Sequence, residues 1–306
     1  MKNVARTIVI LTIALAVPAL AIAQSTTGGL RYTITVTKFE NKAGWYGRWD
    51  IGDAWGTVLT DMLNQTGKFI VLGETDMRAA ALDEQDFAAS GRTAGGGKAP
   101  VTGQMTPAQL LVKGAITHVQ DGTAKGGGGV RVGGFNVGGK GGKGEVNATI
   151  YVVDSTTGMV LASTNVVGVS KQKGLSLGYS TGGWGAAFGG EKNDNVGLAV
   201  QEACAEAVEF IKGQLGGIKW TGSVVMVKDG KVYVNRGSRE GVSTGQQFVV
   251  GDTEVLRDPD TGEVLDESMT EVARLQVSEV REKLAICTVS SGSAGAIEKG
   301  MAIHLP

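Results

Sequence analysis

The sequence has 306 residues, a net charge of −1, 49 glycines, two cysteines and two histidines. A nearly balanced charge argues against a nucleic-acid role that depends on neutralising phosphates. Two cysteines exclude a disulfide scaffold, and two histidines leave almost no material for a zinc site or a histidine-based triad.

The first 23 residues have the pattern of a secretory signal peptide. Lys2 and Arg6 precede an apolar run over residues 8–22, and Ala21-Ile22-Ala23 is a typical cleavage site. The run is too short for a transmembrane helix, and no later stretch reaches the ~18 apolar residues that a helical span needs. We therefore expect an exported protein. No cysteine follows the cleavage site, so the signal gives no reason to expect a bacterial lipid anchor.

Residues 31–39 alternate as in a half-buried strand, with Tyr32, Ile34 and Val36 on one face and threonines on the other. The loop over residues 40–52 then carries Trp45, Tyr46 and Trp49, an unusual density of aromatic side chains for a solvated loop. Either these side chains fold back on the core, or they form a rim or constriction that contacts a client chain. The residues alone leave both readings open.

Helices and strands alternate over the next part of the chain. Helical spacing predicts helices over residues 53–65 and 74–85, and short apolar runs predict strands over residues 69–72 and 112–119. In the second helix we expect Met77, Ala81 and Leu82 to face inward. The order strand–helix–strand–helix–strand is typical of helices that cover a sheet.

Residues 122–190 hold 21 of the 49 glycines. Within them, alternating strands over residues 145–152 and 159–170, joined by a turn at Asp154–Gly158, predict a firm hairpin. The two flanking stretches, residues 126–144 and 171–190, are called the glycine arms below. Their Val, Phe, Leu and Tyr residues recur about every second position, which indicates extended arms that pair with something rather than a linker.

The last helix is predicted over residues 195–215, capped by Asp194 or Asn195. From residue 217 to the end, short strands between turn signals replace the helical pattern, which predicts a small all-β, barrel-like domain. Cys204 lies in the helical pattern and Cys287 in a strand pattern. We expect two buried, unpaired thiols, with a single disulfide as the alternative.

No active site can be assembled from these residues. His118 and His304 are far apart in the chain, and the phosphate-loop spacing over residues 134–140 lacks the following Ser or Thr, because Gly141 stands there. The stretch Asp258–Glu263 lacks the remaining ligands of a calcium loop and is better explained as a hairpin turn. We expect no catalytic residues, no cofactor and no metal, and hence not an enzyme.

Residues 30–215 resemble the CsgG/HfaB family, which is typified by the curli secretion channel of the outer membrane. The resemblance is carried by GKFIVLGETDM, VKGAITHV and VNATIYVVDSTTGMVLASTNVVG, with Val153–Ser163 as the most specific piece. Residues 218–306, with KVYVNRGSREGVSTGQQFVV, resemble the small C-terminal domain of the flagellar protein FlgT.

This resemblance implies an α/β (α+β) domain over residues 24–216, with a mixed sheet packed by helices and glycine-rich β-hairpin insertions. A small all-β domain follows over residues 217–306. In the channel, each subunit contributes two β-hairpins to a shared barrel, and a ring of subunits passes an unfolded client. The glycine arms match those hairpins, and their membrane- or oligomer-facing residues would be Val130, Val132, Phe135, Val137, Leu175, Leu177, Tyr179 and Trp184.

The loop matching the channel's constriction is residues 41–52, so Trp45, Tyr46 and Trp49 would contact the client. The implied function is a homo-oligomeric ring at the outer membrane that secretes or assembles an extracellular polymer. Its partners would be further copies of the chain, a secreted protein client and the outer membrane, and no nucleic acid. The alternative is a periplasmic scaffold or binding module without a pore, similar to the lipoprotein activators of cell-wall synthases that share the α/β core.

Overall fold

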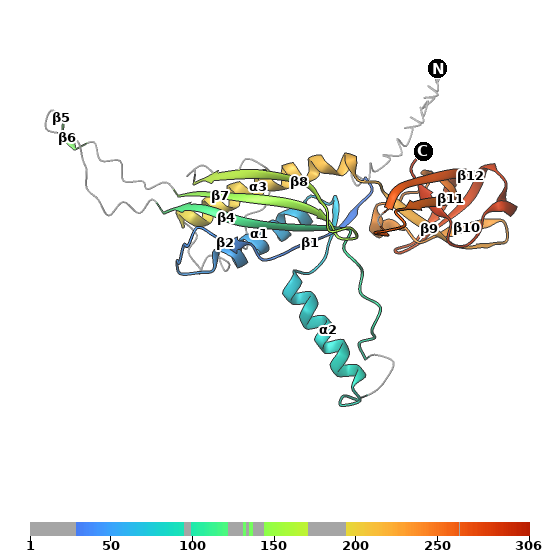
Figure 1. Ribbon diagram of the computed structural model, residues 1–306, viewed down its shortest axis with the longest axis horizontal. Coiled ribbons are helices and arrows are strands. Elements are labelled where there is room, and N and C mark those ends of the chain that lie inside the picture. Colours follow the sequence, from blue (N-terminus) through green and yellow to red (C-terminus); the bar gives the residue numbers. More distant parts are fainter. Residues whose placement is uncertain are drawn as a thin grey trace, which may run out of the picture.

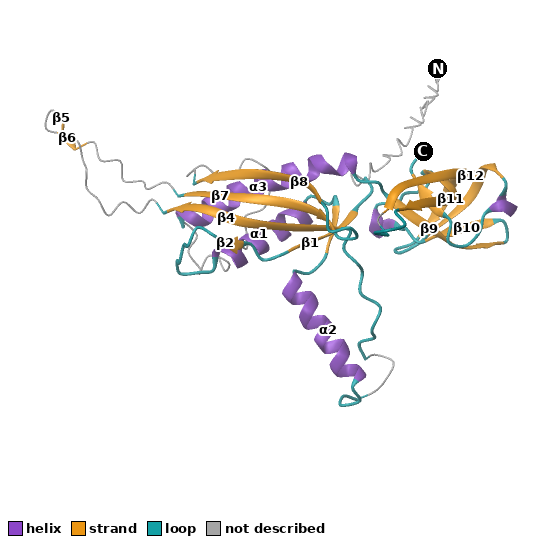
Figure 2. Ribbon diagram, in the orientation of Figure 1, coloured by secondary structure: helices purple, strands orange, loops and turns teal. Residues whose placement is uncertain are grey.

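A computed structural model describes most of the chain. The described residues are 29–94, 99–121, 131–132, 135–136, 144–170, 194–262 and 264–306. The predicted signal peptide and nearly all of both glycine arms lie outside them. The described chain forms a mixed sheet with two covering helices, one projecting helix and a β-barrel (Figures 1 and 2).

The first part of the chain builds a mixed sheet with the strand order β3-β1-β4-β7-β8. Parallel pairing joins β1 to β3 and β4, and antiparallel pairing joins β4 to β7 and β7 to β8. A short strand, β2, continues the parallel pairing along the far half of β4. The strand bounds are β1 Tyr32–Val36, β2 Glu40–Asn41, β3 Phe69–Val71, β4 Leu110–Gln120, β7 Glu145–Asp154 and β8 Val160–Val169.

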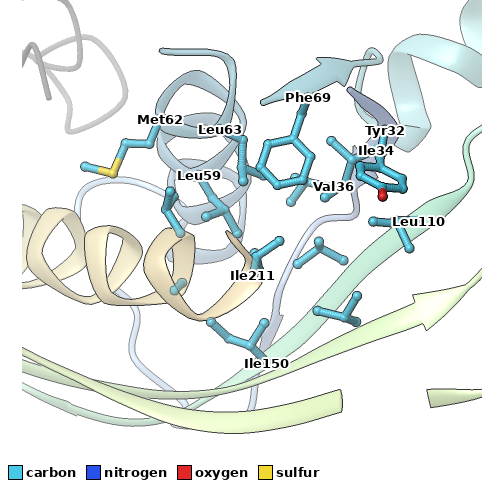
Figure 3. Close-up of a cluster of buried hydrophobic side chains, with 14 of the residues drawn as sticks. Tyr32, Ile34, Val36, Leu59, Met62, Leu63, Phe69, Leu110, Ile150 and Ile211 are labelled. Atoms are coloured by element: carbon cyan, nitrogen blue, oxygen red, sulfur yellow. The ribbon is translucent and has the colours of Figure 1, made fainter. Parts of the chain in front are cut away.

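Two helices cover one face of this sheet: α1 (Ile51–Gln65) and α3 (Asn195–Gln214). Figure 3 shows Leu59 and Met62 of α1, Ile211 of α3 and Ile150 of β7 meeting in one apolar layer. Both helices were predicted from their apolar spacing. The expected mixed sheet packed by helices is confirmed. The apolar stripes of α1 and α3 are buried against the sheet and against each other.

The expectation that β1 is half-buried is wrong: all five of its residues are buried. The strand is central, since β3 and β4 pair on either side of it. Its outward threonines find local partners, with the Thr35 hydroxyl donating to the Gly73 carbonyl at 2.9 Å and Thr33 bonding to Gln109. These bonds offset the cost of removing the hydroxyl groups from water.

The inward placement of Met77, Ala81 and Leu82 is also wrong. Helix α2 (Thr75–Ala89) has no buried residue, and it stands away from the sheet in Figure 1. Met77 is 59% exposed and Leu82 is 50% exposed. At about 100° per residue these two positions lie on different sides of the helix, so they never formed the single stripe that packing requires.

The C-terminal part forms a closed barrel of six antiparallel strands, which confirms the all-β, barrel-like expectation. Trp220 and Phe248 stack in its core with ring centroids 5.3 Å apart. Cys287 in the barrel and Cys204 in α3 are buried free thiols, as expected. The barrel strands are β9 Thr221–Lys228, β10 Lys231–Val234, β11 Gln247–Arg257, β12 Val264–Val280, β13 Ala285–Gly292 and β14 Ala302–His304.

The barrel contacts the start of the α/β sheet. The Arg31 N–H donates to the Glu240 carbonyl at 2.9 Å, and the Tyr32 hydroxyl donates to the Ile218 carbonyl at 2.9 Å. The barrel therefore lies at one end of the sheet (Figure 1). The division into independent domains near residue 216 stays a prediction.

Candidate functional site: the base of the glycine arms

Both ends of the first glycine arm lie on neighbouring strands. Strand β4 ends at Gln120, which is paired with Glu145 at the start of β7. The chain therefore leaves the sheet and returns to it at adjacent positions, as it does in a β-hairpin.

The second glycine arm begins beside the end of the first. The Ser170 N–H donates to the Gly144 carbonyl at 2.8 Å, and the Gly144 N–H donates to the Ser170 hydroxyl at 2.8 Å. Beyond this arm, the described chain resumes at Asp194, where α3 begins. Gly144 also packs tightly against this helix start, because a side chain at residue 144 would collide with the Asn195 carbonyl.

The four arm ends therefore gather at one place, which we call the arm base: Gln120, Gly144, Ser170 and Asp194. It lies at the end of the sheet opposite the barrel (Figure 1). The alternation of β7 and the capping residue of α3 are readable from sequence, but the pairing of Gly144 with Ser170 is not. The one feature of the sequence that hints at this pairing is that both residues border glycine-rich stretches.

The loop over residues 40–52, which we call the aromatic loop, is hydrogen-bonded to the arm base. The Trp49 indole Nε1 donates to Asp194 Oδ2 at 2.6 Å, while Asp194 Oδ1 accepts from the Val196 N–H at 3.0 Å. One carboxylate thus caps α3 and holds the loop. The rings of Trp45 and Trp49 pack against each other with centroids 4.8 Å apart. The Asn41 side chain accepts a hydrogen bond from the Trp45 backbone N–H and donates one to the Trp45 carbonyl.

The three aromatic residues separate into two environments. Trp45 and Trp49 are half-buried and pack on the core, whereas Tyr46 is 93% exposed. The tryptophans fit the reading in which the loop folds back, and Tyr46 alone presents a large side chain to solvent. Contact with a client stays a prediction for all three residues.

Of the predicted arm residues, Val132 and Phe135 fall in the described chain. They pair with each other in a two-stranded sheet of β5 (Arg131–Val132) and β6 (Phe135–Asn136). The others lie outside the described residues: Val130, Val137, Leu175, Leu177, Tyr179 and Trp184.

A small ion-pair network stands where the aromatic loop enters α1. Lys38 Nζ lies 3.0 Å from Asp50 Oδ2 and 2.7 Å from Asp53 Oδ1. Hydrogen bonds to these two carboxylates raise the pKa of Lys38, and the Asp53 backbone N–H lowers the pKa of Asp50, which caps α1. Because the three side chains are more than half exposed, this network orders the loop more than it stabilises the fold.

Across the described ranges, no three His, Cys, Asp or Glu side chains gather in a way that could hold a metal ion. Within the same ranges, no helix has the length and apolarity to cross a membrane. The arm base offers backbone ends, an exposed tyrosine and a capped helix. Such an arrangement can hold and orient two extended segments.

The sequence profile of the curli production assembly/transport component CsgG family matches residues 18–248. The match covers most of the chain, so the protein belongs to the CsgG family. It includes the whole α/β sheet and extends into the first strands of the barrel. No match was found among curated proteins.

Several solved structures are similar to part of this chain and share little of its sequence. A PelC dodecamer from Paraburkholderia phytofirmans is 11% identical with a TM-score of 0.33, covering 58% of this chain and 86% of that one. The hypothetical protein CT253 from Chlamydia trachomatis is 13% identical with a TM-score of 0.36, covering 61% and 99%. The lipoprotein GNA1162 from Neisseria meningitidis is 16% identical with a TM-score of 0.25, covering 61% and 99%.

Proposed function

We propose that this protein is an exported, outer-membrane-associated transport component of the curli-export type, and not an enzyme. It assembles with further copies of itself into a ring that passes or assembles an extracellular polymer. The observation that carries the proposal is the arm base, where the residues that flank both glycine arms lie side by side at one end of the sheet.

This geometry suits a membrane-inserting role for the arms. We propose that each arm forms a hairpin, whose strand edges must be paired before they can enter lipid, because an unpaired backbone group is costly there. Pairing with the arms of neighbouring copies would close a barrel and remove every free edge. The loop that carries Tyr46 is bonded to Asp194 of the arm base through Trp49, and the exposed Tyr46 is the residue that we assign to client contact.

Helix α2 supports self-association. Its 15 residues bury nothing, and isolated helices of that length are marginal in water. Met77 and Phe87, which are 59% and 47% exposed, lie on neighbouring sides of the helix. Contact with a second copy would bury them and supply the packing that α2 lacks within its own chain.

The proposal is tested by fractionating cells that produce the natural protein or a variant without residues 126–143 and 171–190. In the variant, the first shortened loop joins β4 to β7, whose ends Gln120 and Glu145 are already paired. The second joins Ser170 to the start of α3, and Gly144 contacts both of these, so both loops can close without moving the sheet. We expect the natural protein in the outer-membrane fraction, released only by detergent. The variant should stay folded by circular dichroism and appear in the soluble periplasmic extract.

A variant lacking residues 95–98 is the matched control, since it removes glycine-rich sequence elsewhere in the chain. It should remain with the membrane. Recovery of the natural protein as a monomer from a detergent-free periplasmic extract would contradict the proposal and favour a periplasmic scaffold without a pore. If the control variant also left the membrane fraction, membrane association would not depend specifically on the glycine arms.

A further inference from the structure

Strands β11 and β12 extend past the barrel as a two-stranded ribbon. They pair with each other from Gln247–Gln276 out to Arg257–Val264. Strand β14 covers β11 only over Val249–Gly251, and β13 reaches β12 no further than Ala273. Within the described residues no third strand pairs with residues 252–272, which we call the ribbon (Figure 2). A two-stranded ribbon of this kind is only marginally stable in water.

The ribbon is strongly acidic. Eight carboxylates and one arginine lie between Asp252 and Glu271, in a chain whose net charge is −1. Glu271 is paired with Arg274 at 2.8 Å, but in the described part of the chain no cation lies within salt-bridge distance of Glu254, Asp266 or Glu267. The ribbon therefore presents uncompensated negative charge on a narrow surface.

Two pairs of large apolar side chains lie between these charges. Val255, Leu256, Val264 and Leu265 are each at least 39% exposed. Directly across the ribbon, Val255 faces Glu267 and Leu256 faces Asp266. Because side chains alternate between the two faces of a strand, Asp252 and Glu254 of β11 share a face with Asp266 of β12, whereas Val255 shares the other face with Met269. A partner strand with alternating cationic and apolar side chains would place its cations on the first face and its apolar side chains on the second.

The outer edges of both ribbon strands lack a partner strand among the described residues, and that of β11 adjoins a cavity. Where β14 ends, β11 continues from Asp252 to Arg257 with its outer edge uncovered by any described strand. A shallow cavity of about 330 Å³ lies at the root of this edge, lined by Asp252, Thr253 and residues 298–302. The Thr253 hydroxyl is buried there without a hydrogen-bond partner among the described residues.

We propose that the open edge of β11, Asp252–Arg257, binds an extended basic segment of a partner protein, which adds to the ribbon as a further strand. Main-chain bonds along the edge hold the segment, and its alternating Lys or Arg and apolar side chains meet the two faces of the ribbon. The same negative charge repels nucleic acid and anionic lipid surfaces. This surface lies in the barrel, so its function does not depend on ring formation by the glycine arms.

The test uses the mature full-length protein and fluorescence anisotropy with a labelled peptide of alternating lysine and valine, about eight residues long. We expect saturable binding that weakens as salt is raised. A peptide with proline at alternate valine positions keeps the charge but loses main-chain donors and should bind at least about fivefold more weakly. A peptide of alternating glutamate and valine should not bind.

The location is tested with Glu254→Gln/Asp266→Asn/Glu267→Gln, which should weaken binding of the lysine–valine peptide at least about fivefold. All three side chains are exposed, so the barrel core is untouched. The matched control neutralises three exposed carboxylates of α2, Asp83→Asn/Glu84→Gln/Asp86→Asn, and should bind as the natural protein does. Hydrogen exchange should slow at residues 252–257 when the peptide binds.

Equal weakening by the control, or equal binding of the proline peptide, would overturn the proposal, because binding would then be general charge attraction. Protection of amides elsewhere with none at residues 252–257 would overturn it too. The proposal would also be contradicted if the lysine–valine peptide did not bind.

Discussion

Gly168 marks the closest approach of a helix to the sheet. It lies in β8, and a side chain there would collide with the Ala199 carbonyl of α3. Gly213 lies in α3 itself and has open space around the position of a side chain. Substitution of Gly168 therefore tests helix–sheet packing, whereas substitution of Gly213 tests helix propensity alone.

We predict that Gly168→Ala lowers the free energy of unfolding by about 1–3 kcal/mol, because the helix must move off the strand. Gly213→Ala should instead raise it by up to about 1 kcal/mol, since alanine favours a helix interior. Urea unfolding of both variants measures the two effects. A neutral Gly168→Ala variant would show that α3 does not pack on β8 as described.

The two cysteines give a second prediction at this scale. Burial raises the pKa of Cys287 to about 12 and that of Cys204 well above its ordinary value, so neither thiol forms the reactive thiolate at neutral pH. A chromogenic disulfide reagent should leave both thiols unmodified in the folded protein and react with both in denaturant. Absence of reaction in denaturant would mean that the thiols are joined in a disulfide.

The link between Trp49 and Asp194 joins the aromatic loop to α3. Trp49→Phe keeps the apolar ring but removes the 2.6 Å hydrogen bond, and it should cost about 1–2 kcal/mol of stability. Asp194→Ala should cost more, because the helix cap is lost as well. In the double variant the two losses should fall short of additive by at least about 0.5 kcal/mol. Additive losses would mean that the loop is not held by this carboxylate.

At the scale of elements, local patterns could be read from the sequence. Helix α3 was predicted to within one residue because its apolar stripe is long and Asp194 precedes it. The β7–β8 turn was predicted because Asp154 accepts two backbone N–H groups and Gly158 takes a positive φ of 73°. Each signal is complete within a few residues of chain.

Features that depend on distant partners could not be predicted. The burial of the threonine face of β1 depends on contacts with Gly73 and Gln109, which lie 38 and 76 positions away in the chain. The bond from Trp49 to Asp194 spans 145 positions, and no local pattern announces it. Helix α2 was wrongly predicted to have a buried apolar face. Met77 and Leu82 are five residues apart, and this spacing places them on different sides of the helix.

Helix α2 carries the element-scale prediction about assembly. Met77→Ser/Phe87→Ser should leave the fold and thermal unfolding nearly unchanged, because α2 buries nothing within its own chain. It should reduce the mass of the detergent-extracted assembly in light scattering. The control Ala79→Ser/Asp86→Ser changes exposed positions on another side of the helix and should keep the natural mass. Equal masses for both variants would exclude α2 from the contact between copies.

At the scale of the whole molecule, the arm base and the barrel lie at opposite ends of one sheet (Figure 1). The arm base holds the segments that we assign to the membrane and to neighbouring copies. The barrel presents the acidic ribbon at the other end of the sheet, away from those segments. A membrane-facing end and a partner-facing end would thus be joined by the α/β sheet.

The central claim is ring formation through the glycine arms, and negative-stain imaging of the mature protein with and without detergent tests it most directly. We predict closed rings of uniform size in detergent, and no intact rings for the variant without residues 126–143 and 171–190. Single separate molecules for the natural protein under both conditions would contradict the account.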